Sequence, residues 1–199
     1  MNTNIVEHLA KDLVMAGLIK RIGPISLEPR RLSPFQSLVQ SIIYQQLNGK
    51  VADTILGRFE ALFGNQPPTP EQVLTIGPEQ LRAAGLSKPK ANYIRGLSEK
   101  AVAKELLTLE ECDRLEDAEI VERLTEVKGV GRWTAEMFLM FNLGRLDVLP
   151  VHDLGVRRGV QIAYGKKDLP EPEKLETFGE RWKPYRTIAA MYLWRAVDG

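Results

Sequence analysis

Apolar residues recur along most of this chain at intervals of three and four, which is the spacing of one face of an α-helix. At Ser33 the pattern has its own start signal, because serine is followed by proline and then by glutamine three positions on. We predict a helix from there to about Gln46. The Asn-Gly pair that follows predicts a break, with a second helix beginning near Lys50 and ending at Gly64.

The same capping and periodicity signals predict helices over most of the remaining chain. Three of these helices are predicted to start after Thr69, Gly77 and Ser87, and a fourth has Asp117 as its N-cap. The others are predicted over residues 132–142, about 153–163, 172–181 and 184–197. Only residues 22–32 and 148–151 are expected to be extended or to form connectors. We therefore predict an all-α protein of roughly ten helices.

Composition narrows the class without identifying a function. Hydrophobic residues make up 44% of the 199 residues and charged residues 27%, as in average globular proteins. No signal peptide or membrane-spanning run is recognisable, so a reducing cytoplasm is the expected location. The net charge of +1 indicates that any face for a polyanion is local. The single cysteine, Cys112, excludes a disulfide within the chain, a multi-cysteine zinc site and a four-cysteine iron–sulfur cluster.

Residues 124–135 carry the most informative pattern, in which a helix ends, a Gly-x-Gly turn follows and a new helix begins. Gly129 and Gly131 supply a left-handed exit from the helix and let another backbone approach closely. Amides of the turn and of the next helix start would bind an anion, and the flanking Lys128 and Arg132 favour a phosphate. The alternative is an ordinary glycine cap between two packed helices.

A second pattern starts at Leu149 and runs through a proline and His152 to Asp153, where a helix is predicted to begin. Aspartate is a preferred N-cap, which is one interpretation of Asp153. The other is a carboxylate at the mouth of a cleft, its charge held by the amides of the helix start. Arg157 and Arg158 would add positive charge one turn away.

These two segments resemble the helix-hairpin-helix (HhH-GPD) DNA glycosylases, and most of all the 3-methyladenine DNA glycosylase II (AlkA) type. Residues 41–47 also resemble the family segment that enters the minor groove, and residues 180–186 with 191–194 resemble its C-terminal signature. The resemblance implies one unit over 1–199 with two helical lobes and a central cleft. One lobe would span about 38–148 and contain the hairpin 124–135, and the other would combine about 1–37 with 149–199. The N-terminal α/β domain of longer relatives is expected to be absent.

The resemblance implies a monofunctional glycosylase that flips alkylated purines such as 3-methyladenine or 7-methylguanine and hydrolyses their N-glycosidic bond. An abasic site would remain for base excision repair. Asp153 matches the catalytic aspartate, which stabilises positive charge on the deoxyribose and positions or activates water. Bifunctional relatives carry a lysine where this chain has Trp133, so no strand cleavage is expected.

The other implied roles are carried over position by position. The base pocket would be formed by Trp133, Trp194, Met137 and Leu154, and the wedge in the duplex by Gln45 and Gln46. The DNA backbone would be bound by Lys128, Gly129, Val130, Gly131 and Arg132, with a sodium or potassium ion at the carbonyls of Thr125, Val127 and Val130. The alternatives are that the tryptophans are core residues, that the glutamines are an exposed helix end, and that His152 is structural or exposed.

No cofactor is expected to be required beyond that ion. The expected partner is double-stranded DNA with damaged bases, and the expected form is a monomer working on the chromosome, away from membranes. Three rival interpretations remain from the residues: a non-enzymatic helix-hairpin-helix DNA-binding module, a helical protein-interaction domain, and a glycosylase for another class of damaged base.

Overall fold

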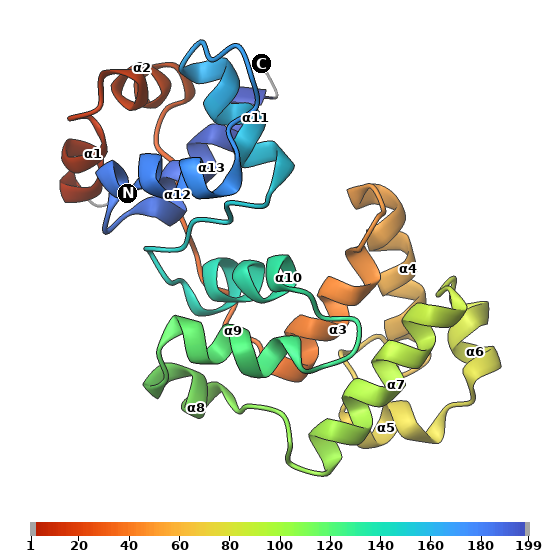
Figure 1. The fold of residues 1–199 in the computed structure, drawn as a ribbon. Coiled ribbons are helices and arrows are strands. Elements are labelled where there is room, and N and C mark those ends of the chain that lie inside the picture. Colours follow the sequence, from red (N-terminus) through yellow and green to blue (C-terminus); the bar gives the residue numbers. More distant parts are fainter. Residues whose placement is uncertain (1–2, 198–199) are drawn as a thin grey trace. The chain divides into compact units, whose positions relative to one another are not determined.

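The computed structural model describes residues 3–197, and no β-strand occurs within this range, which confirms the all-α prediction. The chain forms two compact units (Figure 1). The central unit is Arg31–Phe138, and the terminal unit combines Met1–Arg30 with Leu139–Gly199. These bounds differ from the lobe limits of about 38 and 148 expected from the sequence. One reason is that the first helix of the central unit already begins at Pro34.

The central unit consists of helices that mostly begin where capping residues predicted them. Side-chain oxygens of Ser33, Thr69 and Ser87 each accept a hydrogen bond from a backbone amide in the first helical turn. The helices are α3 (Pro34–Tyr44), α4 (Gly49–Ala61), α5 (Pro70–Thr75), α6 (Pro78–Ala83), α7 (Lys88–Val102), α8 (Leu109–Arg114), α9 (Asp117–Thr125) and α10 (Arg132–Met137). Helix α3 contacts α7, and both helices have fully buried side chains, among them those of Leu38 and Ile42 in α3 and of Ile94 and Leu97 in α7.

Three details of the central unit correct the predictions. Helix α3 ends at Tyr44 rather than near Gln46, because Gln45 is extended (ψ 130°) and Gln46 has a left-handed φ of 58°. Asp117 is the first residue of α9 and not its N-cap, a position that Glu116 occupies without a side-chain hydrogen bond. Helix α8 was not predicted, although Thr108 and a glutamate three residues on form its capping box.

The terminal unit brings together the two ends of the chain. Its helices are α1 (Thr3–Leu9), α2 (Leu13–Ile22), α11 (Leu154–Ala163), α12 (Pro172–Gly179) and α13 (Arg186–Val197), with a short 3₁₀ turn, η2 (Glu180–Trp182). The helix predicted over 132–142 changes at Phe138 from α10 into a π-helix, η1 (Phe138–Leu143). Residues 23–32 and 148–151 contain neither helix nor strand, in agreement with the prediction for most of these segments.

Helices α11 and α13 form the closest helix pair of the terminal unit. A β-carbon built on Gly159 of α11 would lie 2.3 Å from the carbonyl oxygen of Leu193 in α13. The backbones therefore approach to a distance that only glycine permits, and Val156, Val160 and Leu193 are fully buried around the contact. This approach brings Asp153, at the start of α11, beside Trp194 of α13.

Within residues 3–197, none of the helices combines the length and the apolar character that crossing a bilayer requires.

Replacing Gly159 with alanine should lower the free energy of unfolding by about 1–3 kcal/mol, because the methyl group collides with a backbone carbonyl that cannot move aside. Urea unfolding followed by circular dichroism measures the change. Gly57→Ala is the matched control, since Gly57 is an exposed residue inside α4 with no atom near its added β-carbon. That variant should gain about 0.5–1 kcal/mol. Equal stability of the two variants would contradict the close approach of α11 and α13.

Candidate functional site

The hairpin between α9 and α10 is closed by a tight turn. The amide of Val130 donates to the carbonyl of Val127 at 2.9 Å, and both valine side chains are buried. Gly129 lies between these two valines with a left-handed φ of 92°, and Gly131 is the N-cap of α10. The buried side chains of Val127 and Val130 therefore anchor the turn in the core of the central unit.

The two glycines of the turn serve different purposes. A β-carbon on Gly129 would lie 2.5 Å from the ring of Tyr93 in α7, so this glycine is required by packing inside the central unit. Gly131 has an extended backbone (φ −95°, ψ 172°), and apart from its neighbours in the chain nothing lies within 4 Å of its built β-carbon. We expected both glycines to let another backbone approach closely, and the space around the built β-carbons agrees with this only at Gly131.

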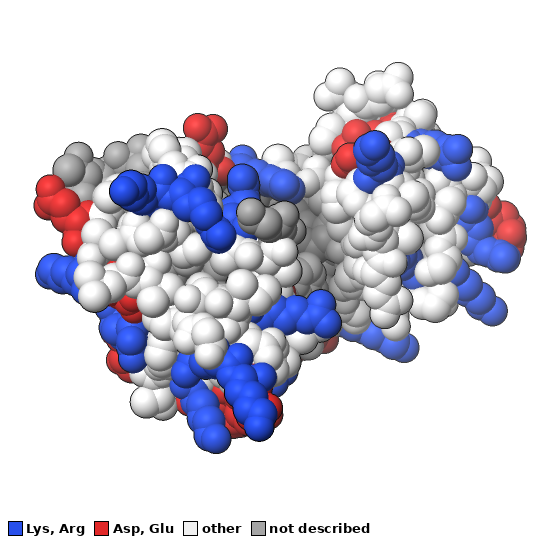
Figure 2. All heavy atoms as spheres, turned by 90° about the horizontal axis from the view of Figure 1, so that it is seen from above, with Lys and Arg blue, Asp and Glu red and all other residues white. Residues whose placement is uncertain are grey.

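Positive charge at the hairpin is local, as the composition implied. Arg132 is exposed and pairs through Nε with Oε1 of the buried Glu136 at 3.0 Å, and Lys128 is exposed on the turn. On the face that Figure 2 shows, lysine and arginine side chains are scattered among neutral and acidic ones and form no single basic surface. The hairpin itself combines backbone amides with the two exposed basic side chains of Lys128 and Arg132.

Gln45 and Gln46, predicted together as the wedge, have different surroundings. Gln45 is half-buried, and its Nε2 donates to the carbonyl of Gly129 at 2.9 Å and to Oγ1 of Thr134 at 3.4 Å. Gln46 is exposed. In the structure, Gln45 therefore supports the hairpin through hydrogen bonds, whereas Gln46 is accessible to a partner.

The sequence interpretation did not single out two apolar neighbours of Gln46. The side chains of Tyr44 and Leu47 are both partly exposed, beside a turn whose other residues are mostly polar. The tyrosine hydroxyl donates to Asp53 of α4. An apolar residue directly after a predicted helix end was the available signal for Leu47.

Asp153 is the N-cap of α11, and its Oδ1 accepts two hydrogen bonds. One comes from the amide of Val156 and one from the indole Nε1–H of Trp194, each at 2.8 Å. Gly155 makes room for the indole, because a β-carbon there would lie 2.7 Å from Cδ1 of Trp194. Phe141 of η1 stacks on the same indole, with ring centroids 6.0 Å apart. Asp153 is therefore a cap and also the acceptor of an aromatic N–H.

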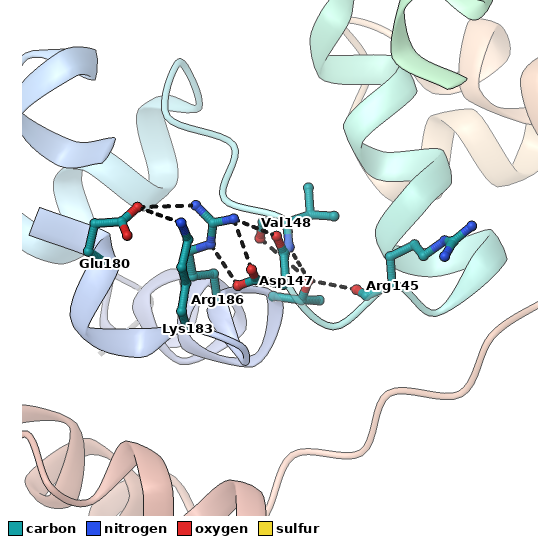
Figure 3. Close-up of polar contacts among 7 residues, drawn as sticks. Arg145, Asp147, Val148, Glu180, Lys183 and Arg186 are labelled. Carbon is teal, nitrogen blue, oxygen red and sulfur yellow. Dashed lines mark hydrogen bonds and ion pairs between the residues drawn. The ribbon is translucent and has the colours of Figure 1, made fainter. Parts of the chain in front are cut away.

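The segment that leads to Asp153 is fastened to the start of α13 (Figure 3). Arg186 donates through Nε and Nη2 to the two carboxylate oxygens of Asp147, at 2.7 and 3.0 Å. Thr187 donates to the carbonyl of Arg145 at 2.7 Å and accepts from the amide of Val148 at 3.0 Å. The first turn of α13 thus holds the segment that leads to Asp153, and Trp194, near the other end of the same helix, binds Asp153 itself. Sequence reasoning matched Arg186 to a family signature but assigned no partner to it.

The four residues predicted to line a base pocket lie in both units. Trp133 is 45% exposed and Met137 half-buried in α10, whereas Leu154 is 49% exposed and Trp194 half-buried in the terminal unit. The fully buried tryptophan of the core is Trp182. Burial therefore does not account for Trp133. His152 is exposed beside Asp153.

The predicted ion site consists only of backbone carbonyls. Neutral oxygens of this kind suit a hard cation, and the Val127 carbonyl, which already accepts one hydrogen bond, has a second lone pair. Among residues 3–197, no three histidine, cysteine, aspartate or glutamate side chains are grouped so that they could hold a metal. Cys112 is the one cysteine and is buried.

Comparisons with known proteins agree with the resemblance found in the sequence. Residues 39–184 match the model of the HhH-GPD superfamily of base excision DNA repair proteins. The chain is 33% identical to the alkylbase DNA glycosidase-like protein mag2 of Schizosaccharomyces pombe, covering 95% of this chain and 91% of that protein. It is 37% identical to DNA-3-methyladenine glycosylase 1 of the same yeast, covering 89% and 79%.

Two solved structures are similar over nearly the whole chain. The S. pombe 3-methyladenine DNA glycosylase Mag1, in complex with abasic DNA, is 34% identical, with a TM-score of 0.88 and coverage of 97% of this chain and 96% of that one. The DNA-3-methyladenine glycosidase of Bacillus halodurans is 42% identical, with a TM-score of 0.86 and coverage of 98% and 89%.

The different roles of the two hairpin glycines can be measured by stability. Gly129→Ala should lower the free energy of unfolding by about 2 kcal/mol or more, through a left-handed φ and a collision with Tyr93. Gly131→Ala should cost less than about 1 kcal/mol, because only an N-cap preference is lost. Chemical denaturation of both variants tests this, and a larger loss for Gly131→Ala would overturn the assignment.

Proposed function

The chain belongs to the HhH-GPD superfamily of base excision DNA repair proteins, and from this premise we propose that it is a monofunctional DNA glycosylase for alkylated purines. It flips bases of the 3-methyladenine or 7-methylguanine type out of double-stranded DNA and hydrolyses the N-glycosidic bond. The observation that carries the proposal is the Asp153 carboxylate, oriented by an amide and an indole N–H on one oxygen.

The chemistry needs a fixed negative charge near the sugar. As the base leaves, positive charge develops on the deoxyribose, and an oriented carboxylate stabilises it without having to reorganise. We assign this role to Asp153, together with positioning or activating the attacking water. An alkylated purine with a positive charge is already an activated leaving group, so one carboxylate suffices.

The flipped base needs an aromatic surface. We assign stacking on the flipped base to Trp133 and Trp194, and further apolar contact with it to Met137 and Leu154. Attraction between a cationic base and an indole face contributes about 0.5–2 kcal/mol for each ring. The exposure of Trp133 supports this assignment, because a residue that is 45% exposed leaves part of its indole surface accessible to a flipped base.

Two segments of the central unit are assigned to the DNA. The amides around Gly131 with Lys128 and Arg132 bind a phosphate, and a monovalent cation held by the carbonyls of Thr125, Val127 and Val130 would add positive charge there. Gln46, with Leu47 beside it, enters the minor groove and fills the gap. Flipping costs a few kcal/mol of unstacking and unpairing, which these contacts offset.

The products follow from the residue at the position of the lyase lysine. Trp133 has no amine that could attack the sugar, so the enzyme forms no Schiff base and leaves an intact strand with an abasic site. We further propose that the protein acts as a monomer, because one site reads one lesion, and that it works on the chromosome in the cytoplasm.

Asp153→Asn should reduce base release from methylated duplex DNA by at least about a hundredfold. Duplex affinity should change little, because asparagine keeps an oxygen for the bonds from Val156 and Trp194. Single-turnover release is measured by mass spectrometry of the freed bases, and strands are checked for nicks before and after alkali. Asp168→Asn, at an exposed loop position, is the control for the loss of one carboxylate. Release at the wild-type rate by Asp153→Asn would remove this residue from the mechanism.

Gly131→Asp should weaken binding to all duplexes alike, damaged or not, because it places negative charge where a phosphate is proposed to bind. Fluorescence anisotropy over a series of salt concentrations measures the affinity and its salt dependence. Gly17→Asp adds the same charge at an exposed position of α2, where nothing lies within 4 Å of the built β-carbon, and should bind as wild type does. Unchanged affinity of Gly131→Asp would exclude the hairpin from the interface.

A further inference from the structure

The ammonium group of Lys90, in the first turn of α7, binds the end of α3. Its Nζ donates to the carbonyl of Ile43 at 2.8 Å and to the carbonyl of Gln45 at 2.7 Å. The last carbonyls of a helix lack partners within that helix, and a cation placed there also meets the negative end of the helix dipole. Lys90 therefore supplies what the end of α3 lacks.

Lys90 makes these bonds although burial disfavours its charge. It is half-buried, and desolvation lowers the pKa of its ammonium group below the usual value of 10.5. An exposed lysine would avoid this cost. The hydrogen bonds to the two carbonyl oxygens at the end of α3 offset this desolvation cost.

The same turn is connected to the hairpin. The backbone carbonyl of Gln45 accepts from Lys90, while the Gln45 side chain donates to the carbonyl of Gly129. One turn after Lys90, Tyr93 packs against Gly129. The start of α7 therefore contacts both the end of α3 and the hairpin, and Gln45 joins these two to each other.

Gln46 needs such support because its backbone is in an unfavourable region. A left-handed φ of 58° is uncommon for a residue other than glycine and persists only where the surroundings enforce it. The carbonyl that precedes Gln46 is the one that Lys90 holds at 2.7 Å. Releasing this carbonyl would let the turn relax away from the conformation that presents Gln46 and Leu47.

We propose that Lys90 is a positioning residue that holds the turn 45–47 against the hairpin, so that Gln46 and Leu47 keep the conformation that enters the duplex while the hairpin binds phosphate. The proposal rests on the proposed function, since it assumes that the hairpin and this turn meet DNA. Lys90 is not assigned a contact with the base or the sugar. A role only as a cap of α3, with no effect on insertion, is the alternative that the test must separate.

The test measures insertion without requiring catalysis. A duplex carries a stable abasic-site analogue with 2-aminopurine as the opposite base, whose fluorescence rises when a side chain unstacks it. The proteins compared are wild type, Lys90→Met, Lys90→Arg and Lys88→Met. Lys88 is exposed two residues earlier in α7, so its replacement removes the same charge and leaves the bonds from Lys90 to the end of α3 in place. Affinity for undamaged duplex, the unfolding midpoint and single-turnover base release are measured on the same proteins.

Lys90→Met should bind undamaged duplex within about twofold of wild type, because the amides and basic side chains of the hairpin are unaltered. Its fluorescence rise and its excision rate should fall about tenfold, the effect of losing charge-assisted hydrogen bonds. Lys90→Arg keeps donors at this position and should recover most of both signals. Lys88→Met should resemble wild type.

Two results would overturn the proposal. One is a wild-type fluorescence rise in Lys90→Met. The other is a parallel loss of affinity, unfolding midpoint and fluorescence that Lys90→Arg does not restore, which would leave Lys90 with a purely structural role. Failure of the proposed function is distinguishable, because wild type would then raise the fluorescence but release no alkylated base.

Discussion

The close crossing of α11 and α13 is the constraint on which the geometry around Asp153 depends. At Gly159 the two backbones approach to a distance that excludes any side chain, and at Gly155 the indole of Trp194 occupies the space of a missing β-carbon. A wider crossing would separate the indole N–H from Asp153 and remove one of the two hydrogen bonds that orient this carboxylate oxygen. Packing of the terminal unit therefore determines the orientation of the proposed catalytic group.

Both units position their proposed functional segments by the same means, a long cationic side chain that binds carbonyl or carboxylate oxygens of another segment. Arg186 holds Asp147 in the terminal unit, and Lys90 holds the end of α3 in the central unit. Each cation lies near the start of a helix, and Arg186 reaches a segment without regular structure while Lys90 reaches the last turn of α3 and the residue that follows it. A loop fixed in this way loses little further entropy when it meets a ligand.

Local signals in the sequence predicted much of the fold, because helix starts are determined by a few neighbouring residues. Ser33, Thr69, Ser87 and Asp153 all cap the helices that follow them. The bonds from Lys90 to Gln45 and from Arg186 to Asp147 join residues 45 and 39 positions apart. Periodicity indicates which face of a helix is buried but not which distant segment covers it, so these pairs were beyond prediction.

For Asp153, a structural role as the N-cap of α11 is compatible with the proposed catalytic role. For Gln45 and Gln46, the structural role and the proposed DNA-binding role fall on different residues. An N-cap carboxylate lies where the helix dipole favours negative charge, so capping α11 also suits a group proposed to face a cationic sugar. Gln45 and Gln46 are adjacent, yet the change of backbone conformation between them turns one toward the hairpin and leaves the other exposed. Two identical neighbouring residues can therefore have different roles. The backbone conformation determines which residue has which role, and composition does not reveal that conformation.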